Sequence, residues 1–264
     1  MRVKVGCCGF AVRGGKKAYY ERFKLVEVQQ TFYKLPRPQT AQRWRSQAPQ
    51  DFEFTVKCWQ AVTHPPTSPT WRKAGVKVPE EKKDKYGFLR PTEENFEAWE
   101  ATAEICKALR ARICVIQCPP SFRFTPENVE NVKAFFGSID RHGLLIAWEP
   151  RADWREHLDV VRGLCEELDL IYTTDVLRHG PLVIGPIFYT RLHGLAAREF
   201  DYRYKYTDED LARLVDILLG LEEEGVEEAY VLFNNIYMAE DASRLLDILA
   251  QKGLAETLGP TGSS

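Results

Sequence analysis

Four side chains that can move protons stand at the ends of short apolar segments in this sequence. They are Glu27, Lys57, Glu149 and His193. Carboxylate, amine and imidazole groups serve proteins as general acids and bases when they are held against a substrate. We therefore interpret these four residues as the candidate catalytic groups.

A second set of polar residues lies close to the same segment ends. Arginine offers planar, bidentate donors that match the oxygens of phosphate or carboxylate. The cations Lys57, Arg151 and Arg191 also roughly balance the carboxylates of this set, which favours an anionic small-molecule partner over a tightly held metal ion. The candidate substrate-binding residues are Arg191, Arg151, Gln117, Asp175, Asn234, Tyr33 and His64.

A divalent metal remains an alternative. Glu27, Glu149, Asp175 and His193 are an oxygen-rich set with one imidazole, which suits Mg²⁺, Mn²⁺ or Zn²⁺. Against this, the chain has only five histidines and lacks HxH and HExxH spacings. We predict no cofactor and no dedicated metal ligands, and we keep a divalent metal as a possibility.

Eight short apolar segments could position these residues as strands. Amphipathic stretches separate most of them, which is the pattern of a parallel sheet, and eight such strands close a TIM-like (β/α)₈ barrel. A doubly wound open sheet is disfavoured because no GxGxxG motif follows the first segment. The predicted strands span residues 3–9, 25–30, 52–58, 113–118, 144–149, 171–175, 187–193 and 229–235.

Alternation within these segments places most of the polar residues on one face. Glu27 opposes Val26 and Val28, for example, and Glu149 opposes Trp148. In barrel enzymes the site lies at the C-terminal ends of the strands, where the βα loops meet. We therefore expect the candidate residues to gather at that end of the barrel.

The predicted helices carry recognisable start signals. Pro126 suits a first helical turn, and Thr207 with Asp210 has the spacing of a capping box. These helices are expected at residues 40–48, 93–110, 126–139, 153–168, 207–225 and 239–253.

Residues 60–92 interrupt the regular pattern after the third predicted strand. They contain five prolines, and residues 71–91 hold seven basic and three acidic residues. The segment has too few apolar residues for a core of its own, so it is either a solvated loop or a flap over the barrel mouth. We expect one barrel domain at 1–255, with this insertion, and a flexible tail at 256–264.

The totals limit the classes of function. The chain has 264 residues, a net charge of −2 and no apolar run long enough for a membrane helix. A membrane partner is therefore not expected, and a nucleic-acid partner is possible but not favoured. Seven cysteines without CxxC spacing suggest buried thiols rather than a disulfide framework, and the start resembles no signal peptide, so we expect a cytoplasmic protein.

Several segments, in order along the chain, resemble the YecE-like family, catalogued as domain of unknown function 72. They are GCCGF (6–10), VEVQQTFYKLP (26–36), FTVKCWQAVTH (54–64), IQCPPSF (116–122), AWEPRADW (147–154), YTRLHG (189–194) and LFNN (232–235). The resemblance implies a TIM-like barrel and no particular reaction. The segment KCWQAVTH resembles the archaeal branch. Cys7-Cys8 and Gln29-Gln30 depart from the Thr-Ser and Asn-Ser pairs that are frequent in the family.

Three hypotheses on function follow. The first is an enzyme that uses acid–base chemistry on a small phosphate- or carboxylate-bearing substrate at the barrel mouth. The second is a divalent-metal-dependent hydrolase or isomerase, or a nucleic-acid-processing barrel in which the basic insertion contacts phosphates. The third is a barrel that binds a ligand or partner without catalysis. The sequence carries no signal for an oligomeric state.

Overall fold

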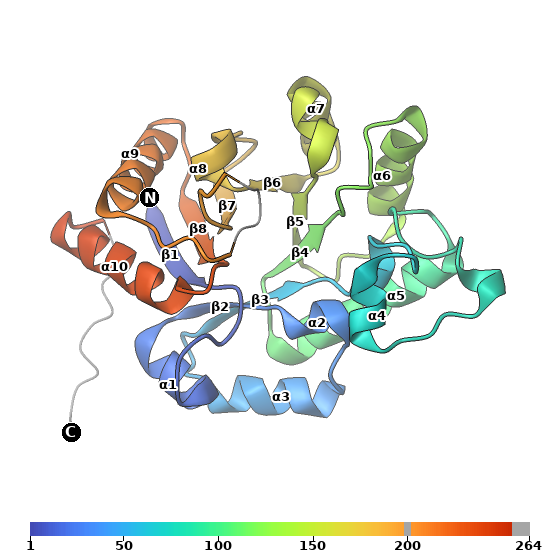
Figure 1. The fold of residues 1–264 in the computed structure, drawn as a ribbon, viewed down its shortest axis with the longest axis horizontal. Coiled ribbons are helices and arrows are strands. Elements are labelled where there is room, and N and C mark those ends of the chain that lie inside the picture. Colours follow the sequence, from blue (N-terminus) through green and yellow to red (C-terminus); the bar gives the residue numbers. More distant parts are fainter. Residues whose placement is uncertain (198–201, 255–264) are drawn as a thin grey trace. The chain divides into compact units, whose positions relative to one another are not determined.

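The computed structural model describes residues 1–197 and 202–254, and its eight strands form a closed barrel in chain order (Figure 1). The barrel predicted from the sequence is therefore confirmed, with every predicted strand present and no strand end shifted by more than two residues. The strands are β1 (Arg2–Cys7), β2 (Leu25–Val28), β3 (Glu53–Lys57), β4 (Ile113–Gln117), β5 (Leu145–Glu149), β6 (Leu170–Thr174), β7 (Ile187–Leu192) and β8 (Glu228–Phe233).

The longest helices begin where the sequence predicts. Thr207 and Asp210 form the expected capping box, and Pro126 occupies the first turn of its helix. The main helices are α3 (Pro38–Gln47), α5 (Glu93–Leu109), α6 (Pro126–Ser138), α7 (Leu158–Glu167), α9 (Asp208–Glu223) and α10 (Met238–Gln251).

The prediction of one continuous helix over 153–168 is wrong. A 3-10 helix η3 (Ala152–Glu156) comes first, and His157, with φ −127° and ψ 44°, separates it from α7. The short helices α1 (Gly15–Arg22), α2 (Gln30–Tyr33), α4 (Pro69–Ala74) and α8 (Val176–His179) were not predicted. Each has eight residues or fewer, which is too short for a helical repeat to be seen in the sequence.

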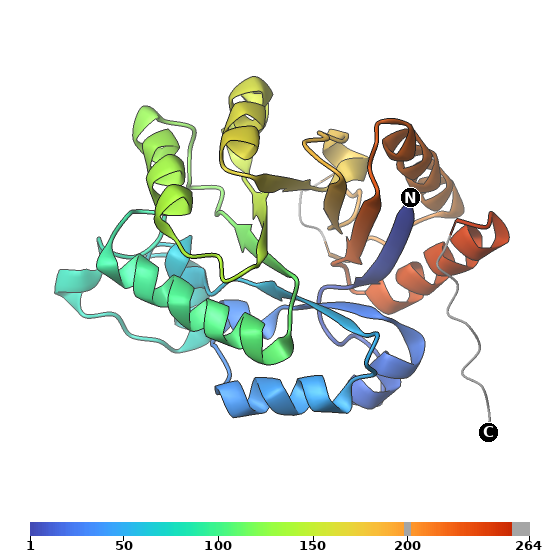
Figure 2. The ribbon, with the colours of Figure 1, turned by 180° about the vertical axis from the view of Figure 1, so that it is seen from behind.

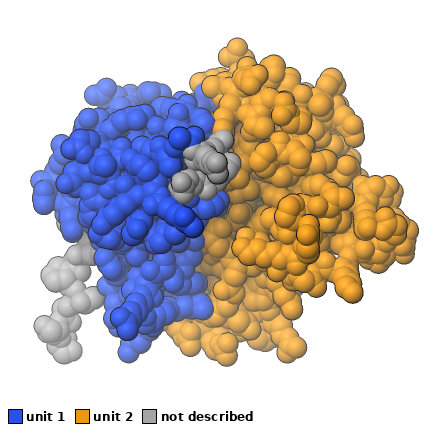
Figure 3. All heavy atoms as spheres, viewed as in Figure 1, with its two compact units in different colours: residues 1–25, 174–264 blue, residues 26–173 orange. Residues whose placement is uncertain are grey.

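The chain divides into two compact units, which are described separately (Figure 3). Unit 1 combines residues 1–25 with 174–264, and unit 2 is residues 26–173. In unit 1, β8 pairs with both β1 and β7 in parallel, from Arg2 opposite Glu228 to Cys7 opposite Phe233 along the first pair. This pairing holds the two ends of the chain in one unit.

Unit 2 contains the run of parallel pairs from β3 to β6. Helices α3 and α5 lie side by side in this unit (Figure 1, Figure 2). Its core includes Trp99, Trp148 and Trp154, all fully buried. Indole side chains have an apolar body that fills volume, and their N–H needs an acceptor when it is buried. The indole N–H of Trp99 donates to the Asp140 carbonyl and that of Trp154 to the Phe122 carbonyl.

The segment 60–92, which the sequence predicts to be an insertion, folds back on its own start within unit 2. The amides of Gly87, Phe88 and Leu89 donate to the carbonyls of Ala61, Thr63 and Val62. The Asn95 side chain of α5 accepts from the Gly87 amide and donates to its carbonyl, at 3.0 and 3.1 Å. The segment is therefore a closed loop tied to α5. It contains the 3-10 helices η1 (Gln60–Val62) and η2 (Glu80–Lys82) as well as α4, and its role as a flap stays a prediction.

Two further expectations concern the chain as a whole. Within the described residues, no helix is both long and apolar enough to span a membrane. The predicted tail at 256–264 lies outside the described residues.

Candidate functional site

The strand register of unit 2 brings three predicted site residues to one face of the sheet. Lys57 is level with Val115, and Gln117 is level with Glu149. Register partners in a parallel sheet point to the same side, and so do residues two apart on one strand. Lys57, Gln117 and Glu149 therefore share a face at the C-terminal ends of β3, β4 and β5, and all three side chains are buried.

Arg151, just beyond β5, pairs with the carboxylate of Glu149. Its Nε and Nη2 both donate to Glu149 Oε1, at 2.7 and 2.6 Å. Both side chains are nearly inaccessible, at 8% and 5% exposure. A buried ion pair of this kind holds its two partners in fixed positions, since either charge alone would be costly to bury.

Phe32 of α2 holds two other predicted residues in place. The Lys57 ammonium lies 4.0 Å from the Phe32 ring centre, and the His64 imidazole meets the same ring edge-on at 4.9 Å. The His64 ring is fixed further by a 2.8 Å hydrogen bond between its Nδ1 and the Thr63 hydroxyl. The His64 carbonyl accepts from the Trp71 indole, also at 2.8 Å. Lys57 and His64 are thus oriented around one aromatic ring.

The environment of His64 keeps its imidazole neutral. Burial lowers the pKa of His64 well below its ordinary value, and the charges of Lys57 and Arg151 lower it further. Both cations are therefore close enough to act on the imidazole. We call the set Lys57, His64, Gln117, Glu149 and Arg151 the β3–β5 cluster.

Glu27 and Tyr33 lie on the segment before this cluster. Glu27, on β2, is fully buried and accepts a hydrogen bond from the Gln29 amide. The Thr31 hydroxyl donates to the Lys57 carbonyl at 2.6 Å, which ties this segment to the end of β3. Tyr33 is half-buried, with its ring centre 4.9 Å from the Lys73 ammonium.

The candidate site residues predicted from the sequence did not include four residues around the cluster. Phe32 and Thr63 orient Lys57 and His64, as described above. The Trp59 indole N–H and the Gln60 side-chain carbonyl are buried and have no hydrogen-bond partner within the described part of the chain. The position of Gln60 in the sequence was a usable signal. It follows Lys57 by three residues, and a turn at this point brings its side chain back toward the end of the strand.

Unit 1 holds a separate group at the end of β7. The backbone amide of His193 donates to Asp175 Oδ2 at 2.7 Å, and its ring Nδ1 lies 3.8 Å from the same oxygen. Asp175 follows β6 directly, and both residues are buried. The carboxylate thus holds the backbone at the end of β7, with the imidazole beside it. We call Asp175, Arg191 and His193 the β7 cluster.

Two further predicted residues belong to unit 1. Arg191 lies within β7 and its side chain is fully buried. Asn234 follows β8, is half-buried, and donates its backbone amide to the Leu192 carbonyl. Its neighbour Asn235 donates to Asp241 Oδ2 at 2.7 Å and thereby joins the end of β8 to α10. That the β7 and β3–β5 clusters serve one substrate stays a prediction.

The cysteines are free and buried, as expected. Burial raises the pKa of Cys7, Cys118 and Cys165 to about 12, so these thiols stay protonated and unreactive at neutral pH. Among the described residues, no group of three or more His, Cys, Asp or Glu could hold a metal ion.

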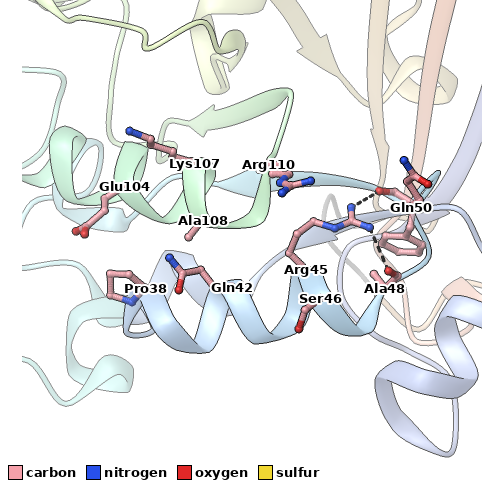
Figure 4. A pocket seen from close by; sticks show the side chains of 11 residues that line it. Pro38, Gln42, Arg45, Ser46, Ala48, Gln50, Glu104, Lys107, Ala108 and Arg110 are labelled. Atoms are coloured by element: carbon pink, nitrogen blue, oxygen red, sulfur yellow. Dashed lines mark hydrogen bonds between the residues drawn. The ribbon is translucent and has the colours of Figure 1, made fainter.

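A surface groove lies elsewhere in unit 2, between α3 and α5, and the sequence did not predict it (Figure 4). Its volume is about 950 Å³, and its walls include Gln42, Glu104, Lys107 and Arg110. Arg45 in this groove donates to the carbonyls of Phe52 and Ala48. Its guanidinium therefore closes the turn between α3 and β3.

Residues 14–262 match the sequence profile described as "Protein of unknown function DUF72". The chain belongs to the DUF72 family. This confirms the resemblance seen in the sequence, while its assignment to an archaeal branch stays a prediction. None of the curated proteins compared with this DUF72 chain matches it.

Solved structures share the fold over nearly the whole chain. A DUF72 family protein from Thermotoga maritima is 24% identical, with a TM-score of 0.71 over 95% of this chain and 100% of that one. One from Enterococcus faecalis is 20% identical, with a TM-score of 0.72 over 99% and 100%. Endonuclease IV from Thermus thermophilus is 11% identical, with a TM-score of 0.52 over 96% and 100%. At these identities the likeness shows a common barrel fold.

Proposed function

We propose that this DUF72 chain binds a small anion through the β3–β5 cluster and performs acid–base chemistry on it. The observation that carries the proposal is the set of charges around His64. Both charges that act on its imidazole are cations, Lys57 and Arg151, and both disfavour its protonation. A site whose field opposes a further positive charge attracts a negative one.

The chemical groups of the cluster fit a phosphate- or carboxylate-bearing substrate. Lys57 is a compact cation whose ammonium can act as a point charge toward an oxyanion, and Arg151 offers directed N–H donors. Glu149 fixes the Arg151 guanidinium by accepting from its Nε and Nη2. The net charge of −2 supplies no general attraction for anions, so binding has to come from these local groups.

The position of the cluster supports an enzyme. In barrel enzymes, active-site residues stand at the C-terminal ends of the strands, and Lys57, Gln117 and Glu149 are the last residues of β3, β4 and β5. Glu27, Lys57 and His193 remain the proposed acid–base residues. Glu149 Oε1 is already occupied by Arg151, which makes Glu149 better suited to positioning Arg151 than to abstracting a proton.

Binding of inorganic sulfate and phosphate tests the proposal, with isothermal titration calorimetry at low ionic strength as the measurement. We expect Lys57→Met to weaken binding by tenfold or more, which corresponds to about 1.4 kcal/mol. The matched control is Lys107→Met, which removes an exposed lysine from α5 in the separate groove (Figure 4). An equal effect of the two substitutions would contradict a site at the β3–β5 cluster.

A nucleic-acid-processing barrel is the second candidate, and the insertion favours it. Arg72, Lys73, Lys77, Lys83 and Lys85 are all exposed in that segment. Exposed cations of this kind contact phosphates, and their binding weakens steeply as salt rises. If the insertion binds a fluorescent single-stranded oligonucleotide through phosphate contacts, we expect the affinity to be lost as salt rises from about 50 to about 200 mM. Charge reversal of these exposed residues separates the two candidates. If anion binding stays unchanged, the anion is not bound by the insertion.

Two hypotheses from the sequence remain beside these. A metal-dependent hydrolase or isomerase would bind one divalent ion per chain, which elemental analysis of purified protein measures. A barrel that binds without catalysis would show the same sulfate affinity as an enzyme but no turnover in a broad panel of phosphorylated and carboxylated compounds.

A further inference from the structure

We propose that His64 is a catalytic residue of the β3–β5 cluster, and that its Nε2 becomes a proton acceptor only when an anionic substrate occupies the site. This inference rests on the proposed function and deepens it, because it makes the bound anion part of the acid–base machinery. It also changes the role expected for His64, which the sequence suggested only as a substrate-binding residue.

The proposal assigns the His64 tautomer in which Nδ1–H donates to the Thr63 hydroxyl. Nδ1 lies 2.8 Å from the Thr63 hydroxyl, and both residues are buried, at 5% and 1% exposure. When Nδ1–H donates to that hydroxyl, the lone pair of the ring is on Nε2. Nε2 is not one of the buried side-chain atoms that lack a hydrogen-bond partner. The proposal takes this nitrogen as the one that a bound substrate contacts.

The surroundings of His64 decide when this nitrogen can hold a proton. The charged groups that act on its ring are Lys57 from the end of β3 and Arg151 from the segment before η3. Arg151 is paired with Glu149. The other contacts are uncharged, namely the Phe32 ring from α2 and the Trp71 indole on the His64 carbonyl. With no anion bound, an imidazolium would face two cations in a buried position, and burial and these charges lower the pKa of His64 well below its ordinary value.

A bound anion reverses this balance. Its negative charge lies near Lys57 and Arg151 and offsets their effect on the imidazole, so protonation of Nε2 becomes easier. In the chemical step, Nε2 uses its lone pair to take a proton from a C–H or O–H of the bound substrate. The electron pair of the broken bond stays on the substrate atom, and the imidazolium later returns the proton.

Nuclear magnetic resonance of the imidazole nitrogens tests this in the full chain, with sulfate as the probe because it does not titrate near neutral pH. His64→Gln assigns the signals, and exposed His142 serves as an internal control. Without sulfate we expect the pKa of His64 to lie well below its ordinary value, and saturating sulfate to raise it by about 1 or more. By linkage, sulfate should bind about tenfold more tightly below the sulfate-free pKa than above the sulfate-bound pKa.

The possible outcomes separate the two proposals. If sulfate binds the β3–β5 cluster and leaves the pKa of His64 unchanged, the role of His64 is overturned while the anion site stands. If sulfate fails to bind there at all, the proposed function and this inference both fall. If the pKa of His64 rises with sulfate, both are supported.

The Thr63 hydroxyl provides a second measurement. Thr63→Val keeps the size of the side chain and removes the acceptor for Nδ1–H, so the fraction of the Nδ1–H tautomer should fall. Thr63→Ser restores a hydroxyl and should restore the tautomer. A wild-type tautomer pattern in the valine variant would overturn the assignment of Nε2 as the proton acceptor.

Discussion

The Arg151 guanidinium places both of its hydrogen bonds to Glu149 on one oxygen, Oε1. This geometry leaves Nη1 outside the two bonds and fixes the plane of the group. Both charges are almost fully buried, so neither can be compensated by bulk water when the other is removed. The pair is therefore a positioning device whose loss should be visible in stability as well as in binding.

We expect Arg151→Met to lower the free energy of unfolding by about 3 kcal/mol or more, because the Glu149 carboxylate stays buried without its partner. Arg151→Met combined with Glu149→Leu should lose much less, since neither charge of this pair is left buried alone. Urea unfolding measures both. Equal losses in the single and double variants would show that the two side chains are not energetically coupled.

At the scale of elements, the sequence predicted whole strands well and short turns poorly. Lys57 and Glu149 were placed correctly because alternation along β3 and β5 separates polar from apolar residues. Thr63 and Phe32 could not be assigned, because their roles depend on η1 and α2, which have three and four residues. Periodicity has no meaning over so short a segment, and only the folded backbone brings Thr63, His64 and Phe32 together.

The insertion is the element that carries Thr63 and His64, and Gly87 closes it. Gly87 has φ +82°, and an added Cβ would lie 2.5 Å from the Pro65 nitrogen. Gly87→Ala should therefore displace the backbone and break the hydrogen bonds to Ala61, Thr63 and Val62. We expect a loss of roughly 2 kcal/mol or more in unfolding free energy and faster amide exchange of Gly87, Phe88 and Leu89.

Gly75 supplies the matched control for this prediction. It lies in the same insertion with φ +68°, but an added Cβ would meet nothing within 4 Å. Gly75→Ala should cost only the conformational strain of a positive φ, roughly 1 kcal/mol, and leave amide exchange at 87–89 unchanged. Similar losses in both variants would mean that the close approach at Pro65 does not hold the loop.

At the scale of the whole molecule, candidate chemistry is present in both units. Unit 2 is one continuous segment with the β3–β5 cluster, whereas unit 1 is built from the two ends of the chain and contains the β7 cluster. The general rule for barrels, that active-site residues come from the ends of several different strands, motivates the expectation that Arg191 and His193 act on the same anion as Lys57.

Sulfate affinity can decide whether the two clusters share a ligand. We expect His193→Gln, which keeps a polar side chain beside Asp175, to weaken sulfate binding severalfold, and Arg191→Ala to abolish binding while the barrel stays folded, as circular dichroism would show. Combined with Lys57→Met, the His193→Gln loss should be non-additive, because groups that hold one anion are coupled through it.

Arg191 is fully buried, so Arg191→Ala also opens a cavity, and its effect on binding has to be compared at equal folded fraction. Full additivity of His193→Gln with Lys57→Met, or no effect of either β7 substitution, would assign the Asp175–His193 pair to a ligand or a structural role separate from the β3–β5 cluster.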